Sequence, residues 1–62
     1  MKLKLFRERL GLSQKDMAIE IGVSTSYYSK VESCFQNPSY KFLVKFKKRF
    51  PVASVDEIFF GK

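Results

Sequence analysis

The alternation of apolar and polar side chains between residues 14 and 33 predicts two short helices joined by a tight turn. Met17, Ala18 and Ile21 fall on one face of the first helix, the arc that an amphipathic helix turns towards a core. Gly22 ends that helix, because glycine adopts a left-handed conformation without a steric penalty. The chain can therefore reverse its direction within a residue or two.

The second helix repeats the apolar spacing at Tyr28 and Val31, after hydroxyl side chains that can cap its first turn. Its remaining face is short and polar, and consists of Thr25, Ser26, Ser29 and Lys30. Two short helices that meet at a sharp angle across a glycine turn define a helix-turn-helix, with its core at residues 14–33.

Three more helices are expected to pack around this pair. The first spans residues 2–10. The fourth spans residues 40–50 behind a Ser39 cap, and the fifth follows a Ser54 cap. Their apolar faces are, in chain order, Leu3, Phe6 and Leu10; Leu43, Phe46 and Phe50, with Tyr40 and Val44 beside them; and Val55, Ile58 and Phe59. The pattern predicts an all-α fold, a compact five-helix domain over residues 1–62.

The composition agrees with one small domain. Of the 62 residues, 45% are hydrophobic and seven are phenylalanine. A chain of this size buries only ~60% of its unfolded surface, so every apolar residue matters. No apolar run approaches the ~20 residues of a membrane span, and the N-terminus carries charges where a signal peptide needs apolar residues. We therefore expect a cytoplasmic protein.

The chain has one cysteine, Cys34, and no histidine. One cysteine cannot form an intramolecular disulfide. Without histidine, a metal site lacks its commonest ligand and an enzyme lacks its usual general base. The six carboxylates do not suggest a catalytic pair. We therefore expect no enzyme activity, no metal and no cofactor.

The charge balance favours a polyanionic partner. Twelve basic residues against six acidic ones give a net charge of +6. Each phosphate that a basic side chain neutralises releases a counterion, which favours binding. Charge alone does not distinguish a nucleic acid from an anionic membrane as the partner. The basic face of the fourth helix is interpreted first as a solvated surface.

An ordered set of residues along most of the chain is similar to a known family. The set comprises Leu12-Ser13-Gln14, the trio Ala18, Gly22 and Val23, the core positions Tyr28 and Val31, then Glu32, and Asn37-Pro38-Ser39. The sequence resembles the phage-repressor and Cro-like (XRE-type, lambda-repressor-like) DNA-binding proteins. The resemblance implies a double-stranded DNA-binding transcriptional regulator, a small phage-type or mobile-element repressor. We expect no effector domain after Lys62 and no small-molecule ligand.

The resemblance places the second helix of the motif in the major groove, where residues matching Thr25, Ser26 and Lys30 read bases. Lys30 can donate to guanine O6 and N7, and Ser29 lies on the same arc. None of these side chains is a bidentate reader, so specificity is expected to be modest or to depend on DNA shape. The candidate phosphate contacts are Gln14, Ser24, Tyr27, Ser33, Gln36 and Asn37.

Tyr27 and Tyr28 differ by about 100° on a helical wheel, so both cannot face the core. Tyr28 takes the core position. Tyr27 is expected to face the flank of the DNA and to bond a phosphate. The alternative is a surface tyrosine that packs on Lys30.

The resemblance also implies an ion pair between Arg7 and Glu32, which would tie the first helix to the end of the third. The alternative is a solvated Arg7 or an Arg7 that contacts a phosphate. The family has a glycine where this chain has Cys34, because the helix ends there in a left-handed conformation. This helix end is therefore expected to differ.

Phe60 is left over from the apolar face of the fifth helix. With Ile58 it is a candidate contact for a two-fold homodimer on a palindromic operator, and packing onto the chain's own core is the alternative. A competing function is a protein-binding adaptor of the antitoxin or anti-repressor type, with Ile19, Phe35 and Phe60 as its contact surface. A basic amphipathic membrane binder is a further alternative.

Overall fold

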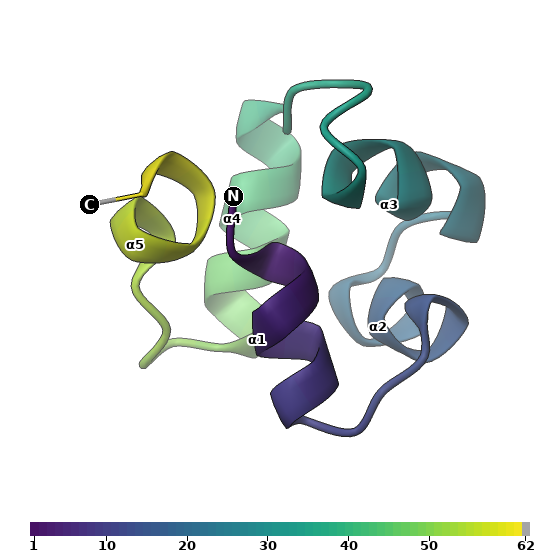
Figure 1. Ribbon diagram of the computed structural model, residues 1–62, viewed down its shortest axis with the longest axis horizontal. Helices are drawn as coiled ribbons and strands as arrows, with labels where there is room; N and C mark the ends of the chain where they lie inside the picture. Colours follow the sequence, from purple (N-terminus) through teal and green to yellow (C-terminus); the bar gives the residue numbers. More distant parts are fainter. Residues whose placement is uncertain (62) are drawn as a thin grey trace.

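The computed structural model describes residues 1–61 and shows five helices in this part of the chain (Figure 1). They are α1 (Leu3–Arg9), α2 (Gln14–Ile21), α3 (Thr25–Glu32), α4 (Tyr40–Arg49) and α5 (Val55–Phe60). No strand occurs among the described residues, so the predicted all-α class is confirmed. None of the helices in residues 1–61 is long and apolar enough to cross a membrane.

Serine side chains set the start of four helices. The first backbone amides of a helix lack partners within the helix, and a serine oxygen at the N-cap supplies one. The hydroxyls of Ser13, Ser24, Ser39 and Ser54 accept from the amides of Asp16, Tyr27, Phe42 and Glu57, respectively, at 3.0–3.2 Å. The caps predicted at Ser39 and Ser54 are confirmed.

The turn between α2 and α3 depends on Gly22, whose φ is 90°. Only glycine adopts this left-handed conformation readily, and it lets the amides of Gly22 and Val23 both donate to the carbonyl of Ala18, at 2.8 and 3.0 Å. α2 therefore ends abruptly, and α3 begins at Thr25. The two helices pack against each other on one side of the molecule (Figure 1).

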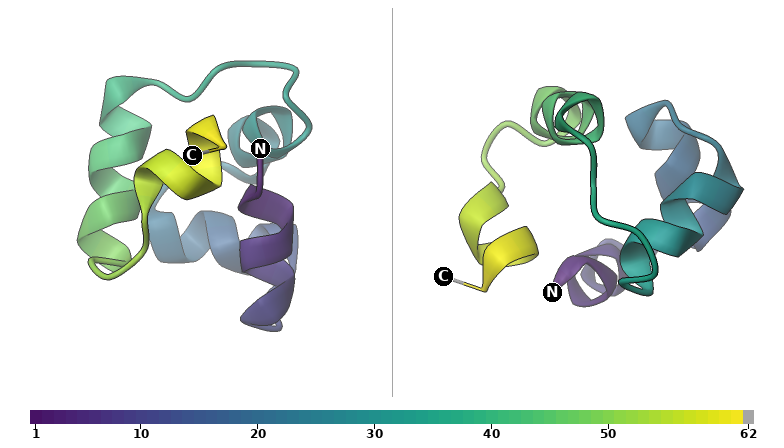
Figure 2. Two further views of the ribbon diagram at one scale, coloured as in Figure 1. Left: turned by 60° about the vertical axis from the view of Figure 1, so that its left-hand side comes forward. Right: turned by 90° about the horizontal axis from the view of Figure 1, so that it is seen from above.

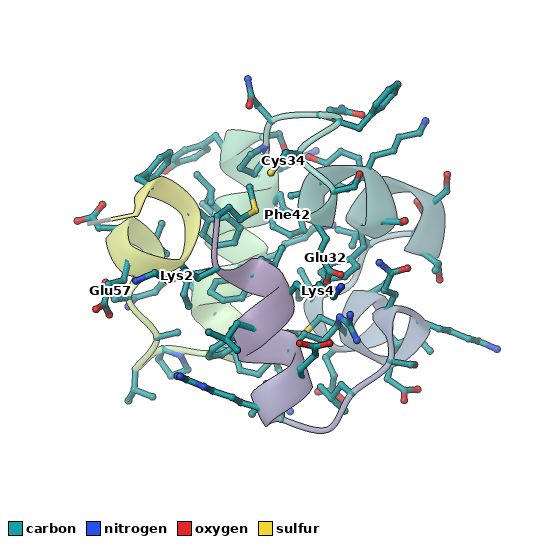
Figure 3. The ribbon with its side chains drawn as sticks, viewed as in Figure 1. Lys2, Lys4, Glu32, Cys34, Phe42 and Glu57 are labelled. Atoms are coloured by element: carbon teal, nitrogen blue, oxygen red, sulfur yellow. The ribbon has the colours of Figure 1, made fainter. Side chains whose placement is uncertain are left out.

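The core lies between the helices and is rich in aromatic rings. Phe42 and Phe46 of α4 meet Phe59 of α5 edge to face, with ring centroids 5.9 and 5.0 Å apart. Figure 3 shows Phe42 in the middle of the bundle. The buried residues are Leu3, Met17, Ala18, Ile21, Tyr28, Val31, Phe42, Phe46, Ala53, Ile58 and Phe59. They include every core position predicted for α2 and α3.

The predicted apolar face of α4 is confirmed at Phe46, and Leu43 and Phe50 pack against the core, but the prediction omits Phe42 and is wrong at Tyr40 and Val44. Phe42 and Phe46 are 1% and 0% exposed, whereas Tyr40 is 82% exposed and Val44 is 38% exposed. The run of apolar residues from Phe42 to Val44 fits more than one helical face. Packing against the rest of the chain selects the face that buries the larger ring, because burial free energy grows with apolar area.

α1 and α5 lie next to each other although they come from opposite ends of the chain (Figure 2). The amide of Lys2 donates to the carbonyl of Ile58 at 2.7 Å. Ile58 is only 8% exposed because it packs in the chain's own core, whereas Phe60 is 57% exposed. A dimer contact through these two residues stays a prediction. Leu10, predicted to be buried, lies beyond the end of α1 and is 45% exposed.

Replacing Phe42 by alanine tests the observed face of α4. We expect the free energy of unfolding to fall by about 3–5 kcal/mol, a large part of the stability of so small a chain, because a buried ring is lost and a cavity remains. Tyr40→Ala removes a ring that is 82% exposed, and serves as the matched control. The control should change stability by less than about 0.5 kcal/mol. Equal losses in urea unfolding would contradict this packing.

Candidate nucleic-acid interface

α3 turns an apolar face inward and a polar face outward. Tyr28 and Val31 on the inward face are completely buried. The outward side chains are those predicted to read bases: Thr25, Ser26 and Lys30 are exposed, and Ser29 is partly buried. Figure 1 shows α3 at the edge of the molecule, on the side away from α5. The helix therefore presents a polar surface that a ligand can reach.

The carboxylate of Glu32, the last residue of α3, accepts hydrogen bonds from three helices. Arg7 of α1 donates through Nε to Oε2 at 2.8 Å and through Nη2 to Oε1 at 3.1 Å. The Tyr28 hydroxyl donates to Oε2 at 2.6 Å, and Nε2 of Gln14 in α2 donates to Oε1 at 3.1 Å. Figure 3 shows Glu32 where α1, α2 and α3 meet. These residues, the Glu32 network, fix the end of α3 against α1 and α2.

Burial makes this ion pair different from one on the surface. The side chains of Arg7 and Glu32 are only 12% and 4% exposed. Burial opposes ionisation of Glu32, but the hydrogen bonds it accepts, that from Arg7 first, outweigh burial, so the pKa of Glu32 lies below its ordinary value. The hydrogen bond to Glu32 raises the pKa of Arg7. Burial, reinforced by Glu32, raises the pKa of Tyr28, whose hydroxyl therefore remains a donor.

Arg7 also links α1 to the segment before α2. Its Nη1 donates to the carbonyl of Leu12 at 2.7 Å. All three guanidinium nitrogens thus have acceptors within the chain. The structure places Arg7 in a partly buried ion pair with Glu32, and not on the surface where it would be solvated or would meet a phosphate.

Two of the predicted phosphate contacts, Gln14 and Tyr27, bond to residues 18 and 12 positions away in the chain. Gln14 uses one of its two amide hydrogens on Glu32. The ring of Tyr27 packs on Phe42, with centroids 5.7 Å apart, and its hydroxyl donates to Oγ of Ser39 at 3.3 Å and accepts from the Ser39 amide at 3.1 Å. The expectation that Tyr27 faces away from the core is wrong, because it anchors the start of α4. Contact of either residue with a phosphate stays a prediction.

Cys34 ends α3 in a left-handed conformation, with a φ of 64°. Its amide donates to the carbonyl of Val31 at 3.1 Å, and the amide of Phe35 donates to the carbonyl of Lys30 at 2.9 Å, which is the pattern of a Schellman motif. The expectation that this helix end would differ from a glycine-ended one is wrong. Cys34 adopts the geometry of glycine, at a cost on the order of 1–3 kcal/mol that the surrounding contacts offset.

The other predicted phosphate contacts lie around the two ends of α3. The Ser24 hydroxyl caps α3, and the Ser33 hydroxyl donates to the carbonyl of Lys30 at 3.2 Å. Gln36 and Asn37 are exposed in the loop that follows. These four residues flank the polar face of α3, and their contact with phosphate stays a prediction.

Two basic residues that sequence reasoning missed hold α4 against the helix-turn-helix. Nζ of Lys45 donates to the carbonyl of Gly22 at 3.1 Å, and Arg49 forms an ion pair with Glu20 of α2. The partners lie 23 and 29 residues apart in the sequence, so no rule of local spacing links them. The basic face of α4 is therefore partly structural.

A groove of about 410 Å³ lies between α1 and α5. Apolar side chains from both helices line it, with Lys2 and Arg9 on the α1 side and Glu57 on the α5 side. None of the residues that line the groove belongs to α3, so the groove and the polar face of α3 are separate surfaces.

Residues 1–61 contain no group of three or more His, Cys, Asp or Glu side chains that could hold a metal ion.

Comparisons with known proteins agree with this architecture. A family model described as helix-turn-helix matches residues 3–58. The HTH-type transcriptional regulator SlrR of Bacillus subtilis (strain 168) is 48% identical over 44 residues, which cover 69% of this chain and 29% of SlrR. The match thus spans less than a third of the length of that relative. No solved structure matches the chain significantly.

Replacing Glu32 by glutamine tests the role of its carboxylate. The change removes the charge that balances the buried Arg7, so we expect the free energy of unfolding at pH 7 to fall by about 3 kcal/mol. Glu20→Gln is the matched control, since it removes the same charge from an ion pair whose side chains are 50% and 36% exposed. The control should cost less than about 1 kcal/mol. Similar losses for both variants would rule out a special role for Glu32.

The same carboxylate predicts how stability depends on pH. Because the pKa of Glu32 is lower in the folded chain, the unfolded chain binds more protons in acid. The contribution of Glu32 to stability is fully present above its ordinary pKa of 4.5 and is lost as the pH falls through the folded pKa. Glu32→Gln should flatten this acid limb of the unfolding free energy, and Glu20→Gln should retain it. An unchanged limb in Glu32→Gln would contradict the assignment.

Proposed function

The chain belongs to the helix-turn-helix family, and from this premise we propose that it binds double-stranded DNA sequence-specifically and regulates transcription. In this proposal α3 enters the major groove and its outward side chains meet the base edges. The observation that carries the proposal is an exposed polar face on a helix whose other face is buried and whose end is fixed by the Glu32 network. The net charge of +6 supplies the attraction to phosphate.

Lys30, Thr25 and Ser26 are the proposed base readers, with Ser29 beside them. Lys30 can donate to O6 and N7 of guanine, and Thr25 offers a hydroxyl and a methyl group, the latter suited to thymine. None of these side chains makes the bidentate contact that arginine, asparagine or glutamine makes. Sequence-dependent DNA shape therefore contributes to discrimination in this proposal.

The proposed phosphate contacts come from both ends of α3 and from the start of α2. Ser24, Ser33, Gln36 and Asn37 are exposed and surround the polar face. Gln14 keeps a second amide hydrogen for a phosphate beside the one it gives to Glu32. Tyr27 is the weakest member of this set, because its hydroxyl already bonds Ser39 twice.

The regulatory role that we propose is repression. The relative SlrR is named as a transcriptional regulator. A DNA-bound protein can exclude polymerase by occupancy alone, which needs no active site. We infer a small repressor of the phage or mobile-element type.

We further propose that two copies occupy a palindromic operator and meet through the side formed by α1 and α5. A two-fold axis can set Lys2 and Arg9 of one copy against Glu57 of the other, because the groove carries both signs of charge. Phe60, 57% exposed at the end of α5, supplies apolar area. Such a dimer would place two α3 helices in half-sites about 34 Å apart.

The adaptor alternative is less well supported. Ile19, Phe35 and Phe60 are 65%, 82% and 57% exposed, but they lie on α2, on the loop after α3 and on α5. Figures 1 and 2 show α2 and α5 on different sides of the molecule, so the three side chains do not form one surface. A membrane-binding α4 is also disfavoured, because its main apolar side chains, Phe42 and Phe46, are buried.

Selection of bound duplexes from a random pool, followed by gel shifts over a range of salt concentrations, tests the proposal. The selected duplex should bind on the order of 10³-fold more tightly than a random one at physiological salt. An adaptor would bind every duplex at the non-specific electrostatic level.

Lysine-to-alanine substitutions on two helices separate base reading from charge. Lys30→Ala should weaken binding to the selected duplex by about 1–3 kcal/mol and relax the preference at one base position. Lys48→Ala removes the same charge from an exposed position on α4 and should leave the preference intact. Competition gel shifts with single-base variants of the duplex measure both effects. If Lys30→Ala weakens all sequences equally, it is not a base reader.

Glutamate substitutions test the proposed dimer side. Phe60→Glu should abolish cooperative filling of two half-sites, because it places a charge in the apolar part of the contact. Val52→Glu adds the same charge at a side chain that is 99% exposed, and should keep the cooperativity. Both variants should bind a single half-site alike in gel shifts. Cooperative binding by Phe60→Glu would move the dimer contact elsewhere.

A further inference from the structure

Phe35 carries an exposed aromatic ring on a backbone that is fixed to α3. Its side chain is 82% exposed. The amides of Phe35 and Gln36 both donate to the carbonyl of Lys30, at 2.9 and 3.2 Å. The amide of Cys34 donates to Val31 in the same turn. The Cα of Phe35 therefore keeps a defined position relative to the last turn of α3.

The ring is not used to complete this helix end. Single apolar side chains are common on protein surfaces. In a Schellman motif, however, an apolar residue at the position of Phe35 frequently packs on the helix residue that accepts its amide hydrogen bond or on the residue before that one. Here the acceptor is Lys30, and Phe35 stays open to solvent. The ring is therefore available to a partner.

The position of Lys30 indicates which partner can reach the ring. In the proposed complex Lys30 extends to base edges, and Phe35 is hydrogen-bonded to the backbone of that same residue. A duplex that receives Lys30 in its major groove therefore passes close to the turn that carries Phe35. Its apolar surfaces there are deoxyribose rings along the groove wall and thymine methyl groups on the floor.

We propose that Phe35 is a non-polar DNA contact, whose ring packs on deoxyribose or thymine methyl at the edge of the site read by α3. The inference rests on the proposed DNA binding and adds an uncharged residue to its polar contacts. A contact of this kind releases no counterion. It therefore contributes to affinity without changing the salt dependence of binding.

Alanine and lysine substitutions at position 35 test this contact by gel shifts on the selected duplex over a range of salt. Phe35→Ala should weaken binding by roughly five- to twentyfold at every salt concentration, because only apolar contact is lost. Phe35→Lys should steepen the slope of log K against log salt by about 0.9, because the new charge meets one phosphate. Thermal unfolding should show both variants folded, since the wild-type ring is exposed.

Val52 provides the matched control. It is 99% exposed and lies beyond the far end of α4 from Phe35. Val52→Ala should leave the affinity unchanged, and Val52→Lys should leave the slope unchanged. Duplexes with deoxyuridine in place of thymine identify the apolar surface: the loss caused by Phe35→Ala disappears if the ring contacts a methyl group and persists if it contacts deoxyribose.

Each outcome shows whether or not Phe35 contacts DNA. Wild-type affinity for Phe35→Ala, or equal slopes for Phe35→Lys and Val52→Lys, overturns the inference even if the wild-type chain prefers the selected duplex. A loss for Phe35→Ala with equal slopes for the two lysine variants also overturns it, because the ring then acts away from the duplex. If the wild-type chain shows no sequence preference, the proposed function fails, while the slopes on any duplex still show whether residue 35 meets DNA.

Discussion

The mutual arrangement of α1, α2 and α3 depends on one buried carboxylate, that of Glu32. It accepts hydrogen bonds from Arg7, Gln14 and Tyr28, so a single charge joins three helices. Helices of seven or eight residues are too short to be stable alone, and a chain of 62 residues has a small core. A buried ion pair adds little net stability over apolar packing, but losing half of it is costly. We infer that its benefit is a fixed orientation of α3.

Contacts at both ends of α3 complete this frame. At the turn before α3, Lys45 of α4 donates to the carbonyl of Gly22. On α3 itself, Tyr27 joins the helix to the cap of α4 at Ser39. At its end, Cys34 adopts a left-handed conformation that returns the chain towards α4. The other helices thus hold α3 through many internal contacts. The exposed side chains of Thr25, Ser26 and Lys30 remain accessible to a ligand. A helix held in this way needs little reordering when it meets a rigid duplex.

Local rules predicted much of this structure. Glycine at position 22 and serine caps fixed the helix boundaries, and helical periodicity placed the polar arc of α3 outward. Local rules failed where distant packing decides. The apolar residues around Phe42 fit two different faces of α4, and periodicity does not choose between them. Tyr27 packs towards α4 because its ring contacts Phe42 and its hydroxyl bonds Ser39. Lys45 has a partner 23 residues away. Cys34 ends α3 with the geometry of glycine because hydrogen bonds in the turn offset its backbone strain, which the residue type alone does not predict. Contacts with DNA depend on a second molecule, and residue spacing and burial describe only the protein chain.

In the proposed complex α3 occupies the major groove. Dimethyl sulfate methylates guanine at N7, which faces the major groove, and adenine at N3, which faces the minor groove. Methylation protection of a selected duplex therefore reports directly on which groove the protein fills. With α3 in the major groove, we expect protection of guanine N7 within the site, with adenine N3 at the same base steps still reactive. Protection of adenine N3 alone, or unchanged reactivity at both atoms in a fully bound duplex, would contradict it.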